Sequence, residues 1–298
     1  MTRKENNIVL FSITLCWAAS YVFIKSLPPD LSSYAYLTLT TGTASVVLVI
    51  VFAKQLKKLN LRILGQGFLM SLLMAGNLLA EKAGIDQLPS SNASFISSLN
   101  ILFVPLLLLM LHRYPTRNNM LGIPIILFGL ALTSGFELRG FLNTGTFYMI
   151  VACLFMAVYT ISADYFTKST DPLLLGVTQM CFTAIIGFLL WLIEEPQTFA
   201  SIEYTRELLS SVFILAFFAK AYAYIMLMYS QRYTSPVSVT IIASTEPIVT
   251  LLLALLIPAS FGAKEVFHLE SLLGAMFIMA GAIVAGTNFL DKRKEQAA

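Results

Sequence analysis

The chain has 298 residues, of which 57% are hydrophobic and 12% are charged. A composition this apolar excludes an ordinary soluble domain, in which about a quarter of the residues are charged. The formal net charge of +3 is too small to indicate a nucleic-acid partner. We therefore expect a protein that is embedded in a lipid bilayer and binds no nucleic acid.

Apolar stretches long enough to cross a bilayer as helices recur along the whole chain. They predict an all-α, polytopic membrane protein with ten transmembrane helices. The expected ranges, in chain order, are 8–26, 32–53, 63–82, 90–111, 118–135, 145–166, 173–193, 208–231, 236–258 and 270–290. The first stretch lacks a small-residue cleavage site after it, so we expect it to remain as a span.

The basic residues are divided unevenly between the two sides of such a bundle. An even number of spans places both termini on one side, which then holds these 13 of the 19 basic residues: Arg3, Lys4, Lys54, Lys57, Lys58, Arg62, Arg113, Arg117, Lys168, Arg232, Lys292, Arg293 and Lys294. The other side holds Lys25, Lys82, Arg139, Arg206 and Lys264. Because cytoplasmic loops carry the excess of Lys and Arg, we expect both termini in the cytoplasm and the protein in the cytoplasmic (inner) membrane.

The two halves of the chain, residues 8–135 and 145–290, share features at matching places. The matched positions are Pro105 with Pro247, 142 residues apart, and Gly122 and Gly129 with Gly274 and Gly281, 152 residues apart. Five spans per half is an odd number, so the second half crosses the bilayer in the opposite sense. The pattern predicts two inverted five-helix repeats, an arrangement in which secondary transporters bind substrate near the midplane.

Two charges, Lys220 and Glu246, interrupt neighbouring apolar spans. They lie about 13 residues before and about 12 residues after the turn that joins the spans, which is roughly 20 Å at 1.5 Å per residue and close to the bilayer midplane. A lone charge there costs at least ~2.5–3.5 kcal/mol. We therefore predict that the two side chains pair. They either form part of a substrate site, with Glu246 as the proton-coupling residue, or are a purely structural ion pair.

The corresponding helices of the first half carry Asn77 and Asn100 at the same depth. They are candidates for a substrate site, and the alternative is that they only hydrogen-bond neighbouring helices together. Glu81 and Lys82 lie further out, where we expect charges at the rim of a cavity or at the interface.

Four aromatic residues complete the candidate site: Trp17, Tyr21, Tyr159 and Tyr224. Trp17 and Tyr21 are spaced i, i+4 on one helix face, Tyr159 belongs to a similar stripe in the second half, and Tyr224 lies one turn after Lys220. Ordinary helix packing is the alternative explanation for these stripes.

The sequence shows no arrangement typical of catalysis or metal binding. The two histidines, His112 and His268, fall at the ends of spans, and neither HExxH nor GxSxG occurs. Cys16, Cys153 and Cys181 are far apart within apolar spans, where they are expected as small buried side chains. We predict no enzyme activity, no cofactor and no metal.

Three segments of the chain resemble EamA-type members of the drug/metabolite transporter superfamily. They are the first helix, Leu15-Cys16-Trp17-Ala18-Ala19-Ser20-Tyr21, the fourth helix from Ser91-Asn92-Ala93-Ser94 to Val104-Pro105, and Gln231-Arg232-Tyr233-Thr234-Ser235-Pro236 followed by Glu246-Pro247. The resemblance covers about residues 8–290. It implies ten helices in two inverted repeats and alternating access around a cavity lined by helices 1, 3, 4, 6, 8 and 9.

Residues and resemblance together predict a secondary active transporter. Its substrate is expected to be a small polar metabolite, amino acid-like or another charged or zwitterionic compound, moved by proton coupling or by exchange. A channel or a non-transporting membrane sensor with the same fold is the alternative. The expected partners are the substrate, protons and the lipid bilayer, and the sequence is compatible with a monomer.

Overall fold

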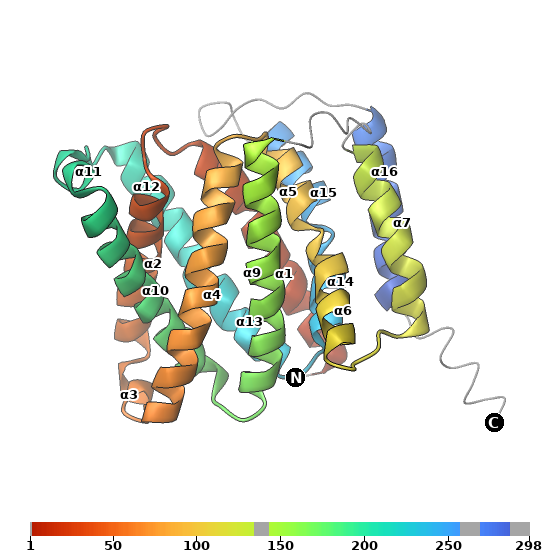
Figure 1. The fold of residues 1–298 in the computed structure, drawn as a ribbon, viewed down its shortest axis with the longest axis horizontal. Helices are drawn as coiled ribbons and strands as arrows, with labels where there is room; N and C mark the ends of the chain where they lie inside the picture. The colour runs from red at the N-terminus through yellow and green to blue at the C-terminus, as the bar shows by residue number, and fades with distance from the viewer. Residues whose placement is uncertain (1, 134–142, 257–268, 287–298) are drawn as a thin grey trace.

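Helices run side by side through the whole of the described chain, which comprises residues 2–133, 143–256 and 269–286 of a computed structural model (Figure 1). The helices before residue 134 are α1 (Arg3–Lys25), α2 (Ser33–Val51), α3 (Ala53–Leu56), α4 (Leu61–Ile85), α5 (Ser90–Ser97), α6 (Asn100–Met110) and α7 (Arg117–Thr133). Those that follow are α9 (Thr144–Thr167), α10 (Pro172–Glu194), α11 (Pro196–Ser201), α12 (Arg206–Ile214), the π-helix η1 (Leu215–Tyr222), α13 (Ala223–Gln231), α14 (Pro236–Ala243), α15 (Glu246–Leu256) and α16 (Leu269–Gly286).

Eight stretches of the described residues are long and apolar enough to cross a bilayer. They are α1, α2, α4, α5 with α6, α9, α10, α12 through α13, and α14 with α15. The shorter α7 and α16 pack against each other at one edge of the bundle (Figure 1), which agrees with the ten predicted helices. The predicted all-α, polytopic membrane fold is confirmed.

The distribution of side chains is the reverse of that in a soluble protein. Large apolar side chains such as Ile50, Met110, Phe213 and Met276 are more than half exposed on the sides of the bundle, whereas many polar ones are buried inside it. The apolar sides suit a hydrocarbon solvent, which leaves the polar groups to hydrogen-bond with one another.

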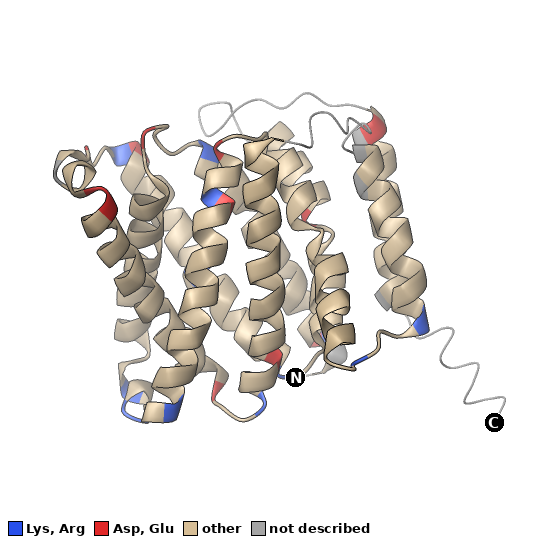
Figure 2. Cartoon of the chain, in the orientation of Figure 1, with Lys and Arg blue, Asp and Glu red and all other residues tan. Residues whose placement is uncertain are grey.

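Charged residues gather at the two ends of the bundle (Figure 2). One end, here called the basic end, carries the start of α1, the α2–α4 connection, and Arg113, Arg117, Lys168 and Arg232. The opposite end, here called the acidic end, carries the α1–α2, α4–α5 and α10–α12 connections and the start of α16 (Figure 1). The charged residues in these segments are Asp30, Asp86, Glu194, Glu195, Glu203, Glu207 and Glu270 beside Lys25, Lys82 and Arg206. Arg139, Lys264 and Lys292 to Lys294 lie outside the described residues.

Side chains at the helix starts explain where the spans begin. The Thr2 hydroxyl accepts a hydrogen bond from the Glu5 amide and the Glu5 carboxylate accepts one from the Thr2 amide, which forms a capping box at α1. At α4, α10 and α14 the side chains of Asn60, Asp171 and Ser235 accept hydrogen bonds from backbone amides of the first turn. These caps satisfy amide groups that each helix start leaves without a partner.

The fourth helix of each half is broken at the same place. α5 and α14 have 8 residues each, α6 and α15 have 11 each, and two residues separate the segments in both halves. Asn100 and Glu246, which begin α6 and α15, are therefore equivalent and lie 146 residues apart. The expected match of Pro105 with Pro247, 142 residues apart, is wrong, because the prolines fall at the sixth and second positions of these segments.

The glycines of α7 and α16 allow the two helices to approach closely. A Cβ on Gly281 would lie 2.8 Å from the Gly122 carbonyl oxygen, and one on Gly129 would lie 2.7 Å from the Gly274 carbonyl oxygen. Contact of Gly122 with Gly281 and of Gly129 with Gly274 is the pattern of two antiparallel, equivalent helices about a two-fold axis. The glycine match read from the sequence thus corresponds to a real packing interface.

Candidate functional site: a polar cavity inside the bundle

A cavity of about 50 Å³ lies inside the bundle, beside the helix breaks of both halves. Its wall includes three charged side chains, Glu81, Lys220 and Glu246, together with Ser97, Ser98, Thr160, Thr240 and Ser244. A volume of this size has room for a few water molecules and is far smaller than the roughly 300 Å³ or more of ordinary ligand pockets. The cavity must therefore widen before it can hold a metabolite.

Seven of the eight predicted site residues line this cavity: Trp17, Tyr21, Asn77, Asn100, Lys220, Tyr224 and Glu246. Residues from before and after residue 134 therefore lie around one cavity. The residues come from α1, α4, α6, η1, α13 and α15.

Tyr159, the eighth predicted site residue, does not line the cavity. Its side chain is fully buried behind Tyr224, with the two ring centroids 5.8 Å apart and the rings edge to face. The Tyr159 hydroxyl accepts a hydrogen bond of 2.7 Å from Gln179 Nε2. Tyr159 thus holds Tyr224 in place, because a stripe of residues predicts a helix face but not which layer of side chains reaches the cavity.

Glu81 lines the cavity, contrary to its expected place at the rim. The Tyr21 hydroxyl donates a hydrogen bond of 3.1 Å to Glu81 Oε1. Side chains on a helix lean toward its N-terminus, and α4 runs from the basic to the acidic end, so the Glu81 side chain leans back toward the middle. Lys82 stays near the acidic end, where its ammonium pairs with Asp86 at 2.5 Å.

The expected ion pair between Lys220 and Glu246 is absent from the described residues. No carboxylate oxygen there lies within 4.0 Å of the Lys220 ammonium, and Glu81 is the carboxylate that acts on it electrostatically. The ammonium instead lies 5.4 Å from the centre of the Tyr36 ring and 5.9 Å from that of Tyr224, where the ring faces attract a cation.

The π-helix explains why the pairing was predicted wrongly. Lys220 lies in η1, whose wider turns change the direction of its side chain relative to a regular α-helix. Lys220 and Glu246 nevertheless line the same cavity.

Several polar atoms of the cavity wall have no hydrogen-bond partner among the described residues. They are the acceptors Asn100 Oδ1 and Glu246 Oε1 and the donor Trp17 Nε1. Asn77 differs, since its Nδ2 donates a hydrogen bond of 3.0 Å to the Ala152 carbonyl oxygen of α9. Asn77 therefore joins two helices, whereas Asn100 has an acceptor free for a ligand or for water.

Two helix N-termini point into the same space. Asn100 begins α6 and Glu246 begins α15, and both residues line the cavity. The N-terminus of a helix carries a partial positive charge that stabilises a nearby anion by roughly 0.3–1 kcal/mol or more when partly buried. The Glu246 carboxylate itself benefits from this field.

Groups that could hold a metal ion are not found in the part of the chain that the structure describes. His112 lies just beyond the end of α6, outside the cavity, and His268 falls outside the described residues. The wall of the cavity thus offers carboxylate, ammonium, amide, hydroxyl and aromatic groups, which suit a polar organic ligand or a proton.

Comparisons with known proteins agree with this architecture. The model of the EamA-like transporter family matches the chain twice, at residues 6–135 and 143–287. A protein of Archaeoglobus fulgidus described as an uncharacterized transporter is 21% identical over 286 residues, which cover 95% of this chain and 86% of the relative. A solved crystal structure superposes with a TM-score of 0.74 at 16% identity, over 99% of this chain and 100% of the other.

Proposed function

The chain belongs to the EamA-like transporter family, and we propose that it works as a secondary active transporter for a small zwitterionic metabolite. The single observation that carries the proposal is the cavity inside the bundle, with two carboxylates, one ammonium and unpartnered acceptors on its wall. Buried charges of this kind are expensive in a membrane, and they are ordinarily kept for substrates, ions or protons.

The chemistry of the wall favours a ligand with both an acidic and a basic group. Lys220 contacts aromatic rings and no carboxylate oxygen within 4.0 Å, so its ammonium is free to bind a substrate carboxylate. Glu246 Oε1 and Asn100 Oδ1 are acceptors without partners, and they suit the ammonium of the same substrate. An amino acid or a similar zwitterion satisfies both ends.

Glu246 is the residue we assign to proton coupling, with Glu81 as its neighbour. The Tyr21 hydroxyl donates a hydrogen bond to Glu81, and Glu246 Oε1 has no hydrogen-bond partner among the described residues. Two carboxylates and one ammonium leave one excess negative charge, which a bound proton or a substrate cation neutralises. Exchange of proton for substrate on Glu246 would link the two fluxes.

Two inverted repeats, residues 8–135 and 145–290, with both termini in the cytoplasm complete the proposal. The equal lengths of the broken helices and the reciprocal glycine contacts of α7 and α16 support the repeats. The concentration of Lys and Arg at the basic end supports a cytoplasmic location for that end. Each half then moves against the other around the shared cavity.

Reconstitution of the purified protein into liposomes tests the proposal. Radiolabelled amino acids and related zwitterions are offered to liposomes with and without unlabelled compound inside. We expect saturable uptake of at least one of them, stimulated by the same compound on the opposite side. Ion conductance without saturation would indicate a channel, and neither uptake nor conductance across the panel would contradict the proposal.

A further inference from the structure

Polar groups continue from the cavity toward the basic end along three helices. On α9, Met156 and Thr160 line the cavity, and Asp164 follows one turn later on the same face. On α13, Gln231 lies seven residues, about two turns, after the cavity residue Tyr224. On α1, Asn6 lies eleven residues, about three turns, before Trp17 and therefore on the same face.

The side chains at the end of these faces are buried and unsatisfied. Gln231 is fully buried, and neither its amide nitrogen nor its amide oxygen has a partner among the described residues. Asn6 is 2% exposed, and its Oδ1 likewise has none. The helix of Gln231, α13, packs against α1, which carries Asn6, and against α9, which carries Asp164, so the three helices share a boundary at α13.

A side-chain amide without a hydrogen-bond partner destabilises a dry interior, whereas in a hydrated space water molecules supply the missing hydrogen bonds. Helix faces that bear them in continuation of a cavity wall have the composition of a passage that fills with water when it opens. In the structure described here that passage is closed, because the same side chains are buried.

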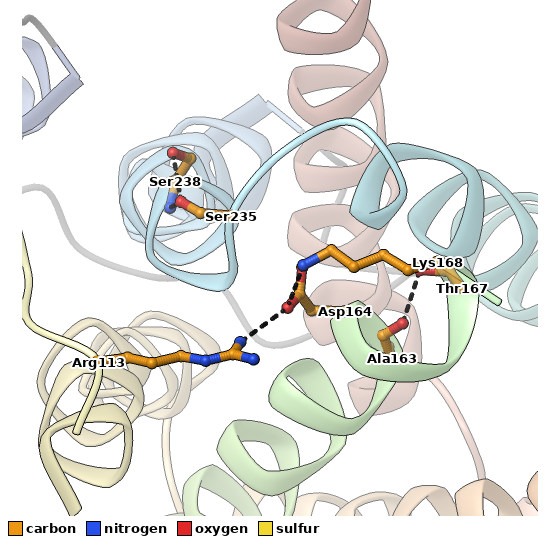
Figure 3. Close-up of polar contacts among 7 residues, drawn as sticks. All are labelled: Arg113, Ala163, Asp164, Thr167, Lys168, Ser235 and Ser238. Carbon is orange, nitrogen blue, oxygen red and sulfur yellow. Dashed lines mark hydrogen bonds and ion pairs between the residues drawn. The ribbon is translucent and has the colours of Figure 1, made fainter. Parts of the chain in front are cut away.

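A cluster of three charged side chains lies at the basic end of this boundary, and we call it the Asp164 cluster (Figure 3). The Asp164 carboxylate is 2% exposed; the Lys168 ammonium lies 2.7 Å from its Oδ1, and the Arg113 guanidinium lies 3.4 Å from its Oδ2. Both cations are more than half exposed. The carboxylate is therefore covered by its two partners on the solvent side.

The cluster connects the two halves of the chain. Arg113 follows α6, whereas Asp164 and Lys168 belong to α9 and its C-terminal end. His112, with φ of 57°, adopts the left-handed conformation just after α6, and the Arg113 amide then bonds the Leu108 carbonyl oxygen at 2.9 Å. This turn ends the helix in the manner of a Schellman motif and directs Arg113 toward α9.

We propose that the Asp164 cluster closes a polar passage, bordered by Asn6 and Gln231, that leads from the central cavity to the basic end of the protein. Loss of the Arg113 contact frees α6 from α9 at that end and admits water and substrate to the buried amides. The inference deepens the proposed function, since it assigns one of the two openings that alternating access requires.

The accessibility of a cysteine in the passage tests this assignment without substrate or gradient. Gln231→Cys is introduced and labelled with a membrane-impermeant maleimide from each side of sealed vesicles. The exposed reference cysteines Gln55→Cys and Gln197→Cys identify the basic and acidic sides, and protein with only Cys16, Cys153 and Cys181 gives the background. We expect slow labelling of Gln231→Cys in the otherwise unchanged protein.

Removal of the contact should speed labelling from the basic side only. We expect the labelling rate to rise roughly twofold to fivefold with Arg113→Gln, because this substitution removes one partly exposed ion pair. With Asp164→Asn we expect a rise of about tenfold. Asp86→Asn, which removes an i, i+4 ion pair at the acidic end, is the matched control and should leave the rate within about twofold.

Two results would overturn the inference. Labelling of Gln231→Cys at an unchanged rate in both cluster variants would show that the cluster closes nothing. An equal rise from both sides would show general loosening instead of an opening at one end. If Asp164→Asn fails to fold, Arg113→Gln decides, because its side chain is already more than half exposed. A protein that gains labelling but moves no substrate would keep this inference and contradict the proposed function.

Discussion

Glu81, and not Glu246, is the carboxylate that acts electrostatically on Lys220, although neither forms an ion pair with it. The ammonium lies within electrostatic reach of Glu81 and shares no ion pair with Glu246. Removal of one partner of a buried charge pair is destabilising by roughly 3–5 kcal/mol, since it leaves an uncompensated charge. The identity of the true partner is therefore measurable as a rescue of stability.

Lys220→Ala should lower the melting temperature, and a second substitution at the partner should restore part of the loss. We expect Lys220→Ala with Glu81→Gln to melt higher than Lys220→Ala alone, because the stranded carboxylate is gone. Lys220→Ala with Glu246→Gln is the matched comparison and should recover less. Thermal unfolding in detergent would compare the three variants with the unmodified protein, and equal or better rescue through Glu246 would refute the assignment.

Asn77 and Asn100 separate the two explanations that the sequence left open. Asn77→Ala removes the hydrogen bond to the Ala152 carbonyl oxygen and should destabilise the protein by about 0.6–2 kcal/mol. Asn100→Ala removes an acceptor without a partner, so we expect loss of transport with an unchanged melting temperature. Uptake and thermal unfolding of both variants test this, and the reverse pattern would exchange their roles.

Two properties of the site residues could be predicted from the sequence: their depth along each span and the helix face on which they lie. Both quantities follow from the 1.5 Å rise and the 3.6-residue turn of a regular helix, which is why seven of the eight candidates line the cavity. The direction in which each side chain points could not be predicted in the same way. Glu81 leans back along α4, Lys220 sits on a π-helix, and Tyr159 lies one layer behind the wall.

The breaks in the fourth helix of each half give a different match between the halves from the one that Pro105 and Pro247 predicted. Proline removes a backbone hydrogen bond in the interior of a helix, but the breaks occur at Ser98–Leu99 and Ser244–Thr245. The serine shared by both breaks, 146 residues apart, was a sequence signal for the correct register. It also leads directly to the equivalence of Asn100 with Glu246.

Substitution of alanine for glycine should have different effects inside the α7–α16 contact, at Gly281, and outside it, at Gly42. Gly281→Ala places a methyl group 2.8 Å from the Gly122 carbonyl oxygen, and we expect destabilisation by about 1–3 kcal/mol. Gly42→Ala meets no atom within 4 Å and should be neutral or stabilising by up to about 1 kcal/mol, since alanine favours a helix. Denaturation of the two variants compares them, and equal effects would argue against a tight contact.

At the scale of the molecule, the charged ends set the expected orientation. Gln55 is exposed in α3 at the basic end, and Gln197 is exposed in α11 at the acidic end (Figure 1). In intact cells an impermeant thiol reagent should label Gln197→Cys but not Gln55→Cys, because excess Lys and Arg remain in the cytoplasm. Labelling of Gln55→Cys alone would reverse the orientation and leave the fold unaffected.

The overall architecture was predictable because the bilayer constrains it strongly. Every buried backbone group must be paired within the protein, so long apolar stretches become helices. The family match and the eight long apolar helices agree with that expectation. The small volume of the cavity was not predictable, because it depends on how far the two halves have closed on each other.

We propose that Glu246, on the wall of the cavity, couples the movement of substrate to the movement of protons. The most direct measurement compares two assays of one substrate in liposomes: accumulation driven by a pH gradient, and counterflow without one. Glu246→Gln carries the charge of the protonated form, so we predict that it loses accumulation and retains counterflow. Glu207→Gln, exposed at the acidic end, is the control and should keep both. Accumulation by Glu246→Gln at the unmodified rate would contradict the account.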